Sequence, residues 1–484
     1  MSSANNQPPF TDEMLAELDP AARRFLRTII DYHETCVEQY EARLKKYEQR
    51  IAELERQLGQ NPSNSSLPPS SQHPHEKPTP KPKKSKRKQG GQPGHTKHER
   101  ALVPPEQVSE TISLRPPNCR RCGESLAGTD PDPLRHQVWE LPPIEPIITE
   151  YQRHRLTCAC CGIETCGELP AGVPTCQSGP RLVAMMTVMM AQFRQSKRRV
   201  ALFFETVCNI PCSTGWIVKM QNLGQQALQP CYDELTDALP QAAAVNLDET
   251  GTKQASQKGW IWTAVTTTFT LFAIRLSRAG QVVRNLLGND FRGIITTDRY
   301  SGYNDYERRQ VCWAHLLRDF QGLIDGGGAG KRIGRRLQTI GEKLFYHWHR
   351  TRDGTTTRET MRRNVRSMKY SMWETLEDGQ RCRDERTAAL CNNLFDRFDQ
   401  LWMFLEHPDV EPTNNAAERA LRHAVIWRKL SFGTHSASGS RFVETYLTVI
   451  ETCRQQRRDV VEFVSESVAA KWQGTPPPSL LSKP

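Results

Sequence analysis

The amino-terminal part of the chain carries hydrophobic residues at alternating spacings of three and four, with Glu, Lys and Arg between them. This a/d pattern predicts a leucine-zipper-like coiled-coil helix over residues 10–59. An amphipathic helix packed on its own globular body is the alternative. Four heptads with charged flanks favour pairing, so we expect a homodimer or a higher oligomer. The seam runs through Leu26, Ile30, His33, Val37, Tyr40, Leu44, Tyr47, Ile51, Leu54 and Leu58.

Hydrophobic positions become rare over residues 60–100, which are rich in Pro, Ser, Gly and Lys. A segment with so little to bury is predicted to be a disordered basic linker. Lys plus Arg exceed Asp plus Glu by 65 − 54 = 11, and much of that excess lies here. Such a run attracts a polyanion, most often nucleic acid, although a solvated linker explains it equally well. Its basic residues are Lys77, Lys81, Lys83, Lys84, Lys86, Arg87 and Lys88.

Residues 101–177 contain two cysteine pairs, each spaced Cys-x-x-Cys and followed by glycine. Two such knuckles predict a zinc-ribbon domain, because each turn directs two thiolates at one ion and four sulfur atoms close a structural site. Cys160 and Cys166 lie nearby and are alternatives for the fourth ligand. The predicted ligands are Cys119, Cys122, Cys158 and Cys161.

The chain has 15 cysteines, and no apolar segment follows Met1 or is long enough to span a bilayer. We therefore expect thiols and metal ligands in a reducing cytosol, with no membrane partner. Residues 178–240 are predicted to be helical. Arg199 to Val207, a turn at Asn209 and a helix capped by Ser213 resemble a helix-turn-helix, and a helical hairpin packed for structural reasons is an equal alternative.

Two predicted strands end in an aspartate, in AVNLDETG at Asp248 and in FRGIITTDRYSGYN at Asp298. We assign residues 241–325 to the first part of a ribonuclease H-like catalytic domain. The first and fourth strands of that fold are neighbours, so the two carboxylates could share Mg²⁺ (or Mn²⁺) ions about 3.5–4 Å apart. Glu249 follows Asp248 directly, but strand alternation turns its side chain to the opposite face, so it is not included.

A third carboxylate is found in EPTNNAAERALRHAVIW, where Thr413, Asn414 or Asn415 can cap a helix that carries Glu418. A surface pair of Glu418 with Arg422 is the alternative, worth only about 0.3–0.5 kcal/mol. We predict a helical insertion over residues 326–408, the second part of the catalytic domain over 409–470 and a disordered tail over 471–484. The fold class is therefore multidomain α/β.

Several motifs together resemble the transposases of the insertion sequence sixty-six family over nearly the whole chain. The resemblance implies a DDE-type enzyme, whose triad falls on Asp248, Asp298 and Glu418, and a bacterial, nucleoid-associated location. It also implies binding of terminal inverted repeats, metal-dependent strand cleavage and strand transfer, and small accessory proteins of the same element. The motifs are NPSNSSLPPSSQ, KQGGQPGH, the paired knuckles, LDETG, KGWIW, TDRYSGYN, VCWAHLLRDF, PTNNAAERALR, WRKLSFGTHSASGSRF and CRQQ.

Basic residues around the glutamate helix and in the linker are candidate phosphate contacts, with a merely solvated face as the alternative. Cys312 and His315 form a Cys-x-x-His sequence without a second pair nearby, so we expect a structural or DNA-positioning role for them. Trp313 is expected in the core. The candidate DNA-binding residues are Lys83, Lys84, Lys86, Arg87, Lys88, Arg419, Arg422, Arg428, Lys429 and Arg441.

Two other functions fit the same residues. A ribonuclease H-like nuclease would cut DNA without joining it, and the detection of strand-transfer products discriminates between the two enzymes. A domesticated, noncatalytic DNA-binding regulator would keep the zinc ribbon and the fold. Carboxylates at all three triad positions argue against the regulator.

Deleting residues 77–88 should flatten the salt dependence of DNA binding, because these basic side chains release counterions when they contact phosphates. The measurement is the slope of log K against log salt concentration for the full chain and the deletion variant. An unchanged slope would remove the linker from DNA binding.

Overall fold

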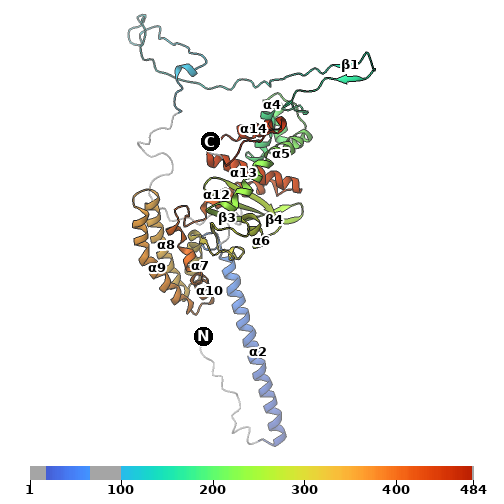
Figure 1. The fold of residues 1–484 in the computed structure, drawn as a ribbon. Helices are drawn as coiled ribbons and strands as arrows, with labels where there is room; N and C mark the ends of the chain where they lie inside the picture. Colours follow the sequence, from blue (N-terminus) through green and yellow to red (C-terminus); the bar gives the residue numbers. More distant parts are fainter. Residues whose placement is uncertain (1–17, 66–99, 482–484) are drawn as a thin grey trace. The chain divides into compact units, whose positions relative to one another are not determined.

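The computed structural model describes residues 18–65 and 100–481. The chain divides into two units, and each is described by itself. The larger unit contains a mixed sheet with helices on both sides (Figure 1). Among the described residues, no helix is both long and apolar enough to cross a membrane. The larger unit comprises Met1–His73, Pro170–Gln195 and Val218–Pro484, and the smaller one Pro74–Leu169 and Ser196–Ile217.

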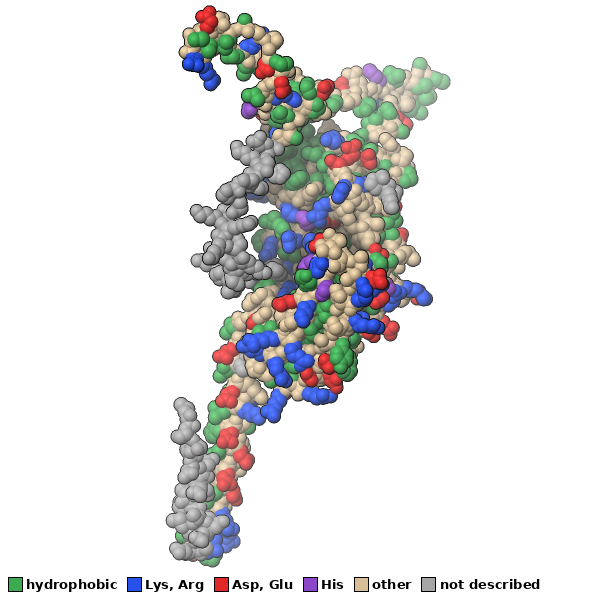
Figure 2. Space-filling view, turned by 90° about the vertical axis from the view of Figure 1, so that its left-hand side faces the viewer, with side chains coloured by type: hydrophobic (Ala, Val, Ile, Leu, Met, Phe, Trp, Pro, Cys, Tyr) green, Lys and Arg blue, Asp and Glu red, His purple; other side chains and the backbone are tan. Residues whose placement is uncertain are grey.

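Helix α2 (Pro20–Leu58) forms within the segment whose heptad pattern predicted a helix. The Asp19 carboxylate caps it by accepting the N–H groups of Ala21 and Ala22. Large hydrophobic side chains remain exposed along the helix, for example 60% of Leu44. Figure 2 shows hydrophobic, acidic and basic side chains together at its surface. The predicted residues 10–17 lie outside the described part.

A short ordered turn follows α2. Asn64 donates a 3.1 Å hydrogen bond to Asp325, and the Asn61 side chain accepts the N–H of Ser63. The beginning of the predicted linker is therefore a hydrogen-bonded turn. The seven basic residues of the run from Lys77 to Lys88 lie between residues 66 and 99, outside the described part of the chain.

The smaller unit contains the two cysteine knuckles. Strands β1 (Arg155–Thr157) and β2 (Glu164–Cys166) pair in antiparallel fashion around the second knuckle. Gly123 and Gly162 have φ angles of +77° and +73°, and each donates its N–H to the carbonyl of the first cysteine of its knuckle. The two knuckles thus have the same glycine-dependent turn.

Helix α4 (Lys197–Val207) is capped by Ser196, and the turn after it passes through Asn209, which has a φ angle of +54°. Helix α5 (Thr214–Ala238) follows, with Ser213 accepting the N–H of Trp216. These elements match the predicted helix-turn-helix-like segment in their order. Tyr232 of α5 donates to the carbonyl of Phe272 in the sheet, so the second helix is also a core element.

The five-stranded sheet has the order β5-β4-β3-β6-β7. β3 pairs antiparallel with β4, and β4 antiparallel with β5. β3 pairs parallel with β6, and β6 parallel with β7, so the prediction that the first and fourth strands are neighbours is confirmed. The strands are β3 (Ala244–Gln254), β4 (Gln257–Val265), β5 (Thr270–Arg275), β6 (Ile294–Thr297) and β7 (Arg309–Val311).

The helices after β7 share one hydrophobic core that begins at the sheet. Trp313 is fully buried, as predicted, and its indole donates to the carbonyl of Leu401. Gln310 donates to the same carbonyl, so the end of the insertion is fixed to β7. The helices are α7 (Trp313–Gly326), α8 (Gly330–Arg352), α9 (Arg358–Gln380), α10 (Glu385–Phe395), η5 (Phe398–Leu401) and α11 (Met403–Glu406).

The remaining helices pack around the sheet. In Figure 1, α12 and α13 lie on one side of the sheet and α6 on the other. Residues 474–481 belong to the predicted disordered tail, but Leu480 is buried and donates its N–H to Glu234 of α5, so this part of the tail is ordered. The helices are α3 (Pro180–Ala191), α6 (Gly280–Leu287), η4 (Ser301–Tyr303), α12 (Asn415–Ser431), α13 (Ala437–Gln456) and α14 (Val460–Gln473).

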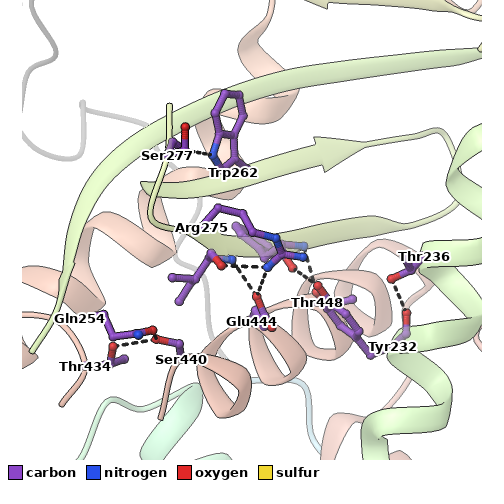
Figure 3. A network of polar contacts seen from close by, with 12 residues as sticks. Tyr232, Thr236, Gln254, Trp262, Arg275, Ser277, Thr434, Ser440, Glu444 and Thr448 are labelled. Carbon is purple, nitrogen blue, oxygen red and sulfur yellow. Dashed lines mark hydrogen bonds and ion pairs between the residues drawn. The ribbon is translucent and has the colours of Figure 1, made fainter. Parts of the chain in front are cut away.

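Side chains of α13 cap the edge strand β5 (Figure 3). Glu444, Thr448 and Thr452 accept the backbone N–H groups of every second residue of the strand, at 2.7, 2.9 and 3.1 Å. Four helical residues rise about 6 Å and two strand residues about 6.6 Å, so the two repeats match. The helix thereby protects an edge that could otherwise pair with another strand.

Replacing Thr448 with Val should lower the free energy of unfolding by about 1–3 kcal/mol, because the buried N–H of Phe272 loses its acceptor. Urea denaturation of the full chain measures this change, and hydrogen exchange of the Phe272 amide should become faster. Thr339→Val is the matched control, since that hydroxyl is exposed and bonds only its own helix. Equal effects of both substitutions would contradict a stabilising role for the contact.

Candidate active site

The parallel pair of β3 and β6 places Asp248 level with Asp298. Ala244 is paired with Ile294, a difference of 294 − 244 = 50, and the two aspartates differ by the same number, 298 − 248 = 50. The Asp248 carboxylate accepts the N–H of Glu249 at 2.8 Å, and the Asp298 carboxylate accepts the N–H of Tyr300 at 3.0 Å. Asp298 directly follows the last residue of β6, as predicted, but Asp248 does not end its strand: it is the fifth residue of β3, which pairing with β4 continues to Gln254.

Glu418 is brought to the sheet by the start of α12. The side chain of Asn414, the residue before the helix, does not form the cap that the sequence predicted. Its amide instead donates to the carbonyl of Leu247 at 2.7 Å and accepts from Asn246 at 3.1 Å. Because these contacts flank Asp248 in β3, the first turn of α12, which carries Glu418, lies beside the two aspartates. Sequence reasoning missed this role of the Asn pair.

The three carboxylates repel one another. Burial raises the pKa of Asp248 well above its usual range, and the charges of Glu249, Asp298 and Glu418 raise it further. Burial also raises the pKa of Glu418, against the lowering effect of Arg318. Two acids with raised pKa values, Asp248 and Glu418, beside a third carboxylate are suited to bind a cation and mark a candidate functional site.

The donor set fits divalent metal ions. Carboxylate oxygens are the ligands that Mg²⁺ and Mn²⁺ prefer, and Oε1 of Glu418 is buried without a hydrogen-bond partner among the described residues. The oxygens of the three acids do not all lie within 4.8 Å of one another.

Cys312 and His315 lie next to Glu418. Their ligand atoms and those of Glu418 form the only group of three or more such side chains within 4.8 Å in the described part of the chain. Cys312 is fully buried and accepts the N–H of Asn414 at 3.2 Å, which supports the structural role expected for it. Burial, with the charge of Arg318, lowers the pKa of His315 to about 4, so its imidazole is neutral at pH 7.

The alternative pair of Glu418 with Arg422 is not formed: the nearest basic groups are His315 and Arg318, each 3.6 Å away.

A buried arginine, Arg309, holds the backbone of Asp298 at the end of β6. Arg309 of β7 is 1% exposed and donates to the backbone carbonyl of Asp298, to Thr297 at 2.8 Å and to Asn304 at 3.1 Å. Burial lowers its pKa to about 10, which leaves the guanidinium charged at pH 7. Arg309 fixes the backbone that carries the acid, a role that its position in the sequence did not reveal.

Strand alternation excluded Glu249 from the predicted metal ligands. Its hydrogen-bond partners do not include Glu418. Its carboxylate accepts hydrogen bonds from Tyr303 and from Arg278. Burial and the charge of Asp298 raise the pKa of Glu249, while Tyr303 and Arg278 lower it. The glutamate is thus the centre of a second polar cluster beside the three acids.

The two predicted zinc knuckles are present as turns, but the structure does not bring their four thiols into one group within 4.8 Å among the described residues. Hydrogen bonds from backbone N–H groups within each knuckle, followed by one from the second cysteine, lower the pKa values of Cys119 and Cys158. Lowered thiol pKa values favour the thiolate that binds metal.

The predicted DNA-binding residues differ in how far their side chains are exposed. Arg428 is half-buried, and its guanidinium donates to the carbonyl of Gly251 in β3. The five predicted linker residues lie outside the described part of the chain. The exposed candidates are Arg419, Arg422, Lys429 and Arg441.

Comparison with known families adds three matches. Residues 175–441 match the transposase IS66 family, and residues 116–162 match the zinc-finger binding domain of transposase IS66. Residues 8–101 match a family of unknown function, DUF6444. The zinc-finger match contains all four predicted cysteine ligands and supports a structural zinc site.

Curated relatives come from Sinorhizobium fredii. The uncharacterized protein y4hP is 24% identical over 407 residues, which cover 76% of this chain and 73% of the relative. The uncharacterized protein y4qI is 26% identical over 209 residues, or 40% of this chain and 38% of the relative. The uncharacterized protein y4jO is 31% identical over 97 residues, or 20% of this chain and 30% of the relative.

These matches define the class of protein as a transposase. The transposase match covers 441 − 175 + 1 = 267 of 484 residues, more than half of the chain, and includes all three acids of the candidate site. The chain belongs to the IS66 family of transposases.

Replacing Asp248 with Asn should stabilise the metal-free protein at pH 7. The folded state raises the pKa of Asp248 above its ordinary value of 3.8. The folded protein therefore binds a proton at this carboxylate more tightly than the unfolded chain does. Stability therefore falls as pH rises from about 4 through the raised pKa, and stays lower above it. The variant should gain about 2–4 °C in melting temperature for each kcal/mol of relieved repulsion, and should respond less to Mg²⁺.

Thermal unfolding at pH 4 and pH 7, with and without Mg²⁺, measures this difference. The advantage of the variant should shrink towards pH 4, where the wild-type group is also neutral. Asp305→Asn is the control, since that carboxylate is 63% exposed in a surface pair with Arg284. A variant that is less stable than wild type at pH 7 without metal would contradict the repulsion.

Proposed function

We propose that this chain is a DDE-type DNA transposase of a bacterial insertion sequence, which binds terminal inverted repeats and catalyses DNA strand cleavage and strand transfer. The observation that carries the proposal is the register of β3 and β6, which sets Asp248 level with Asp298 while α12 presents Glu418 beside them. Membership of the IS66 family supports the reaction class.

The catalytic domain is proposed to be ribonuclease H-like. Three antiparallel strands followed by two parallel ones, in the order β5-β4-β3-β6-β7, support this assignment. Helices α8 to α11 form the insertion between the second aspartate and the glutamate. Near the end of the insertion, the carbonyl of Leu401 accepts hydrogen bonds from Gln310 and Trp313. The chain is therefore anchored before α12 begins, whatever the length of the insertion.

Asp248, Asp298 and Glu418 would hold Mg²⁺ or Mn²⁺, which when bound stabilises the attacking and leaving oxygens of a phosphodiester in an in-line displacement. Asn414 and Asn246 keep α12 against β3, and Arg309 keeps the backbone of Asp298 in place. The Nδ1 atom of His315 lies 3.6 Å from Oε1 of Glu418, beyond hydrogen-bonding distance, and its pKa of about 4 leaves the imidazole uncharged at pH 7, so it does not neutralise that carboxylate.

Other parts of the chain would bind the substrate and the partner chain. The zinc ribbon would hold one Zn²⁺ in its four thiolates, and Arg419, Arg422, Lys429 and Arg441 would contact DNA phosphates. The exposed apolar seam of α2 supports self-association, which would hold two element ends together. Small accessory proteins of the same element complete the proposal, in a cytoplasmic, nucleoid-associated setting.

The test is a cleavage and strand-transfer assay with the full chain, Mg²⁺ and labelled DNA that carries the element ends. Wild type should give products joined to target DNA. Asp298→Asn and Glu418→Gln should each reduce both products by at least about 10³-fold, because each removes a charged metal ligand. Asp305→Asn, an exposed surface aspartate, should leave the rates unchanged.

Each other outcome points to a different protein. Cleaved DNA without joined products would favour a ribonuclease H-like nuclease. Binding without cleavage, the same in all variants and with the accessory proteins present, would favour a noncatalytic DNA-binding regulator.

A further inference from the structure

Three basic side chains converge on Trp260 of β4. Arg278 lies with its guanidinium carbon 4.8 Å from the Trp260 ring centre, and the Lys258 ammonium lies 5.1 Å from it. Arg428 reaches the carbonyl of Gly251, the residue paired with Trp260 across the sheet. This cluster was not predicted from the sequence, because its members come from β4, α12 and the loop after β5.

Arg278 is held in one orientation. Its Nε and Nη2 atoms donate to the same oxygen of Glu249, at 2.9 and 2.7 Å. The guanidinium carbon also lies 3.9 Å from the Tyr300 ring centre, and the Tyr300 hydroxyl donates to the Arg278 carbonyl at 2.9 Å. A planar cation fixed by a carboxylate and an aromatic ring loses little freedom when it binds a ligand.

The group that holds Arg278 is itself buried. The Glu249 side chain is only 1% exposed, and its second oxygen accepts the hydroxyl of Tyr303, which is fully buried. The Tyr303 ring stacks edge-on against Trp262. Glu249 is therefore not free to turn towards the metal site, and its charge is used to hold the arginine.

One edge of the guanidinium remains open. The Arg278 side chain is 39% exposed, and no described residue accepts a hydrogen bond from its Nη1 atom. The open edge lies close to the catalytic acids, because Tyr300, which contacts the guanidinium, donates its N–H to Asp298. Burial alone would lower the pKa of Arg278, but Glu249, with Tyr300 and Asp298, raises it.

We propose that Arg278, held by Glu249, Tyr300 and Trp260, binds a backbone phosphate of the DNA next to the phosphodiester that is cleaved. This inference rests on the proposed function, since it concerns the substrate of the same site. A guanidinium with a free edge presents paired N–H donors that match phosphate oxygens. Glu249 acts through Arg278 and is a positioning residue, not a fourth metal ligand.

A comparison with Arg275 shows what distinguishes Arg278. It lies three residues earlier, is similarly exposed at 43%, and is also paired with a buried glutamate, Glu444 (Figure 3). Its Nη1 atom is used twice inside the protein, by Glu444 and by the carbonyl of Ile274. Arg275 therefore fastens α13 to the sheet, and it is a matched control.

The experiment scans the DNA phosphates one at a time. Methylphosphonate replaces each phosphate around the cleavage point in a duplex with an element end, and binding by the full chain is measured without divalent metal. Neutralising the contacted phosphate should weaken wild-type binding about tenfold, and should have almost no effect on Arg278→Ala. Glu249→Gln should weaken this position dependence, and Arg278→Lys should restore part of it.

The control Arg275→Lys should keep the wild-type profile at every position. An Arg278→Ala profile that is uniformly weaker, with the same dependence on position as wild type, would overturn the phosphate contact and indicate a structural role. Loss of Mg²⁺ affinity in Glu249→Gln with an unchanged phosphate profile would overturn it in favour of a metal ligand.

The scan reads binding alone, so its result is separate from catalysis. A position-specific loss in wild type that is missing in Arg278→Ala, together with absent cleavage, would support the contact and reject the enzyme. Cleavage by wild type without a position-specific loss of its binding would reject the contact and support the enzyme. Absence of DNA binding would overturn both.

Discussion

The parallel pairing of β3 with β6 is the constraint on which the candidate site depends. A parallel pair needs a crossover, and here β4, β5 and α6 supply it between the two strands. Once Ala244 lies opposite Ile294, the residues four positions further on must be level, and both are aspartates. A shift of one residue would move one carboxylate to the other face of the sheet. The register therefore decides whether a site exists at all.

The third acid depends on contacts between segments that are far apart in the chain. Asn414 bridges to Leu247 across 167 residues, and Cys312 accepts the N–H of the same asparagine. These contacts join the residue before α12 to β3 and to the end of β7. The position of Glu418 is therefore set by β3 and the end of β7.

Local patterns predicted the elements, and they failed where distant residues pair. Heptad spacing predicted α2, apolar runs predicted the starts of β3 and β6, and the knuckle glycines predicted their own turns, since each signal lies within a few residues. The strand end predicted at Asp248 was wrong, because pairing with β4 continues β3 to Gln254. The cap expected from Asn414 was wrong because its amide bonds β3 instead. Arg309, Arg278 and the tail contacts of Leu480 have partners from other elements, so no periodicity could indicate them. Alternation kept Glu249 out of the predicted metal ligands, but it could not name Arg278 as its partner.

The acceptors along α13 also have a consequence for synthesis of the chain. The three N–H groups of β5 find their acceptors 170, 176 and 182 residues later. After the last strand, which ends at Val311, the ribosome still has to translate 444 − 311 = 133 residues to reach Glu444, before the strand edge is closed. During that interval the nascent chain exposes unpaired amide groups on a hydrophobic strand, which another nascent chain could match. The late arrival of one helix thus makes translation speed and chaperone access part of how this fold is reached.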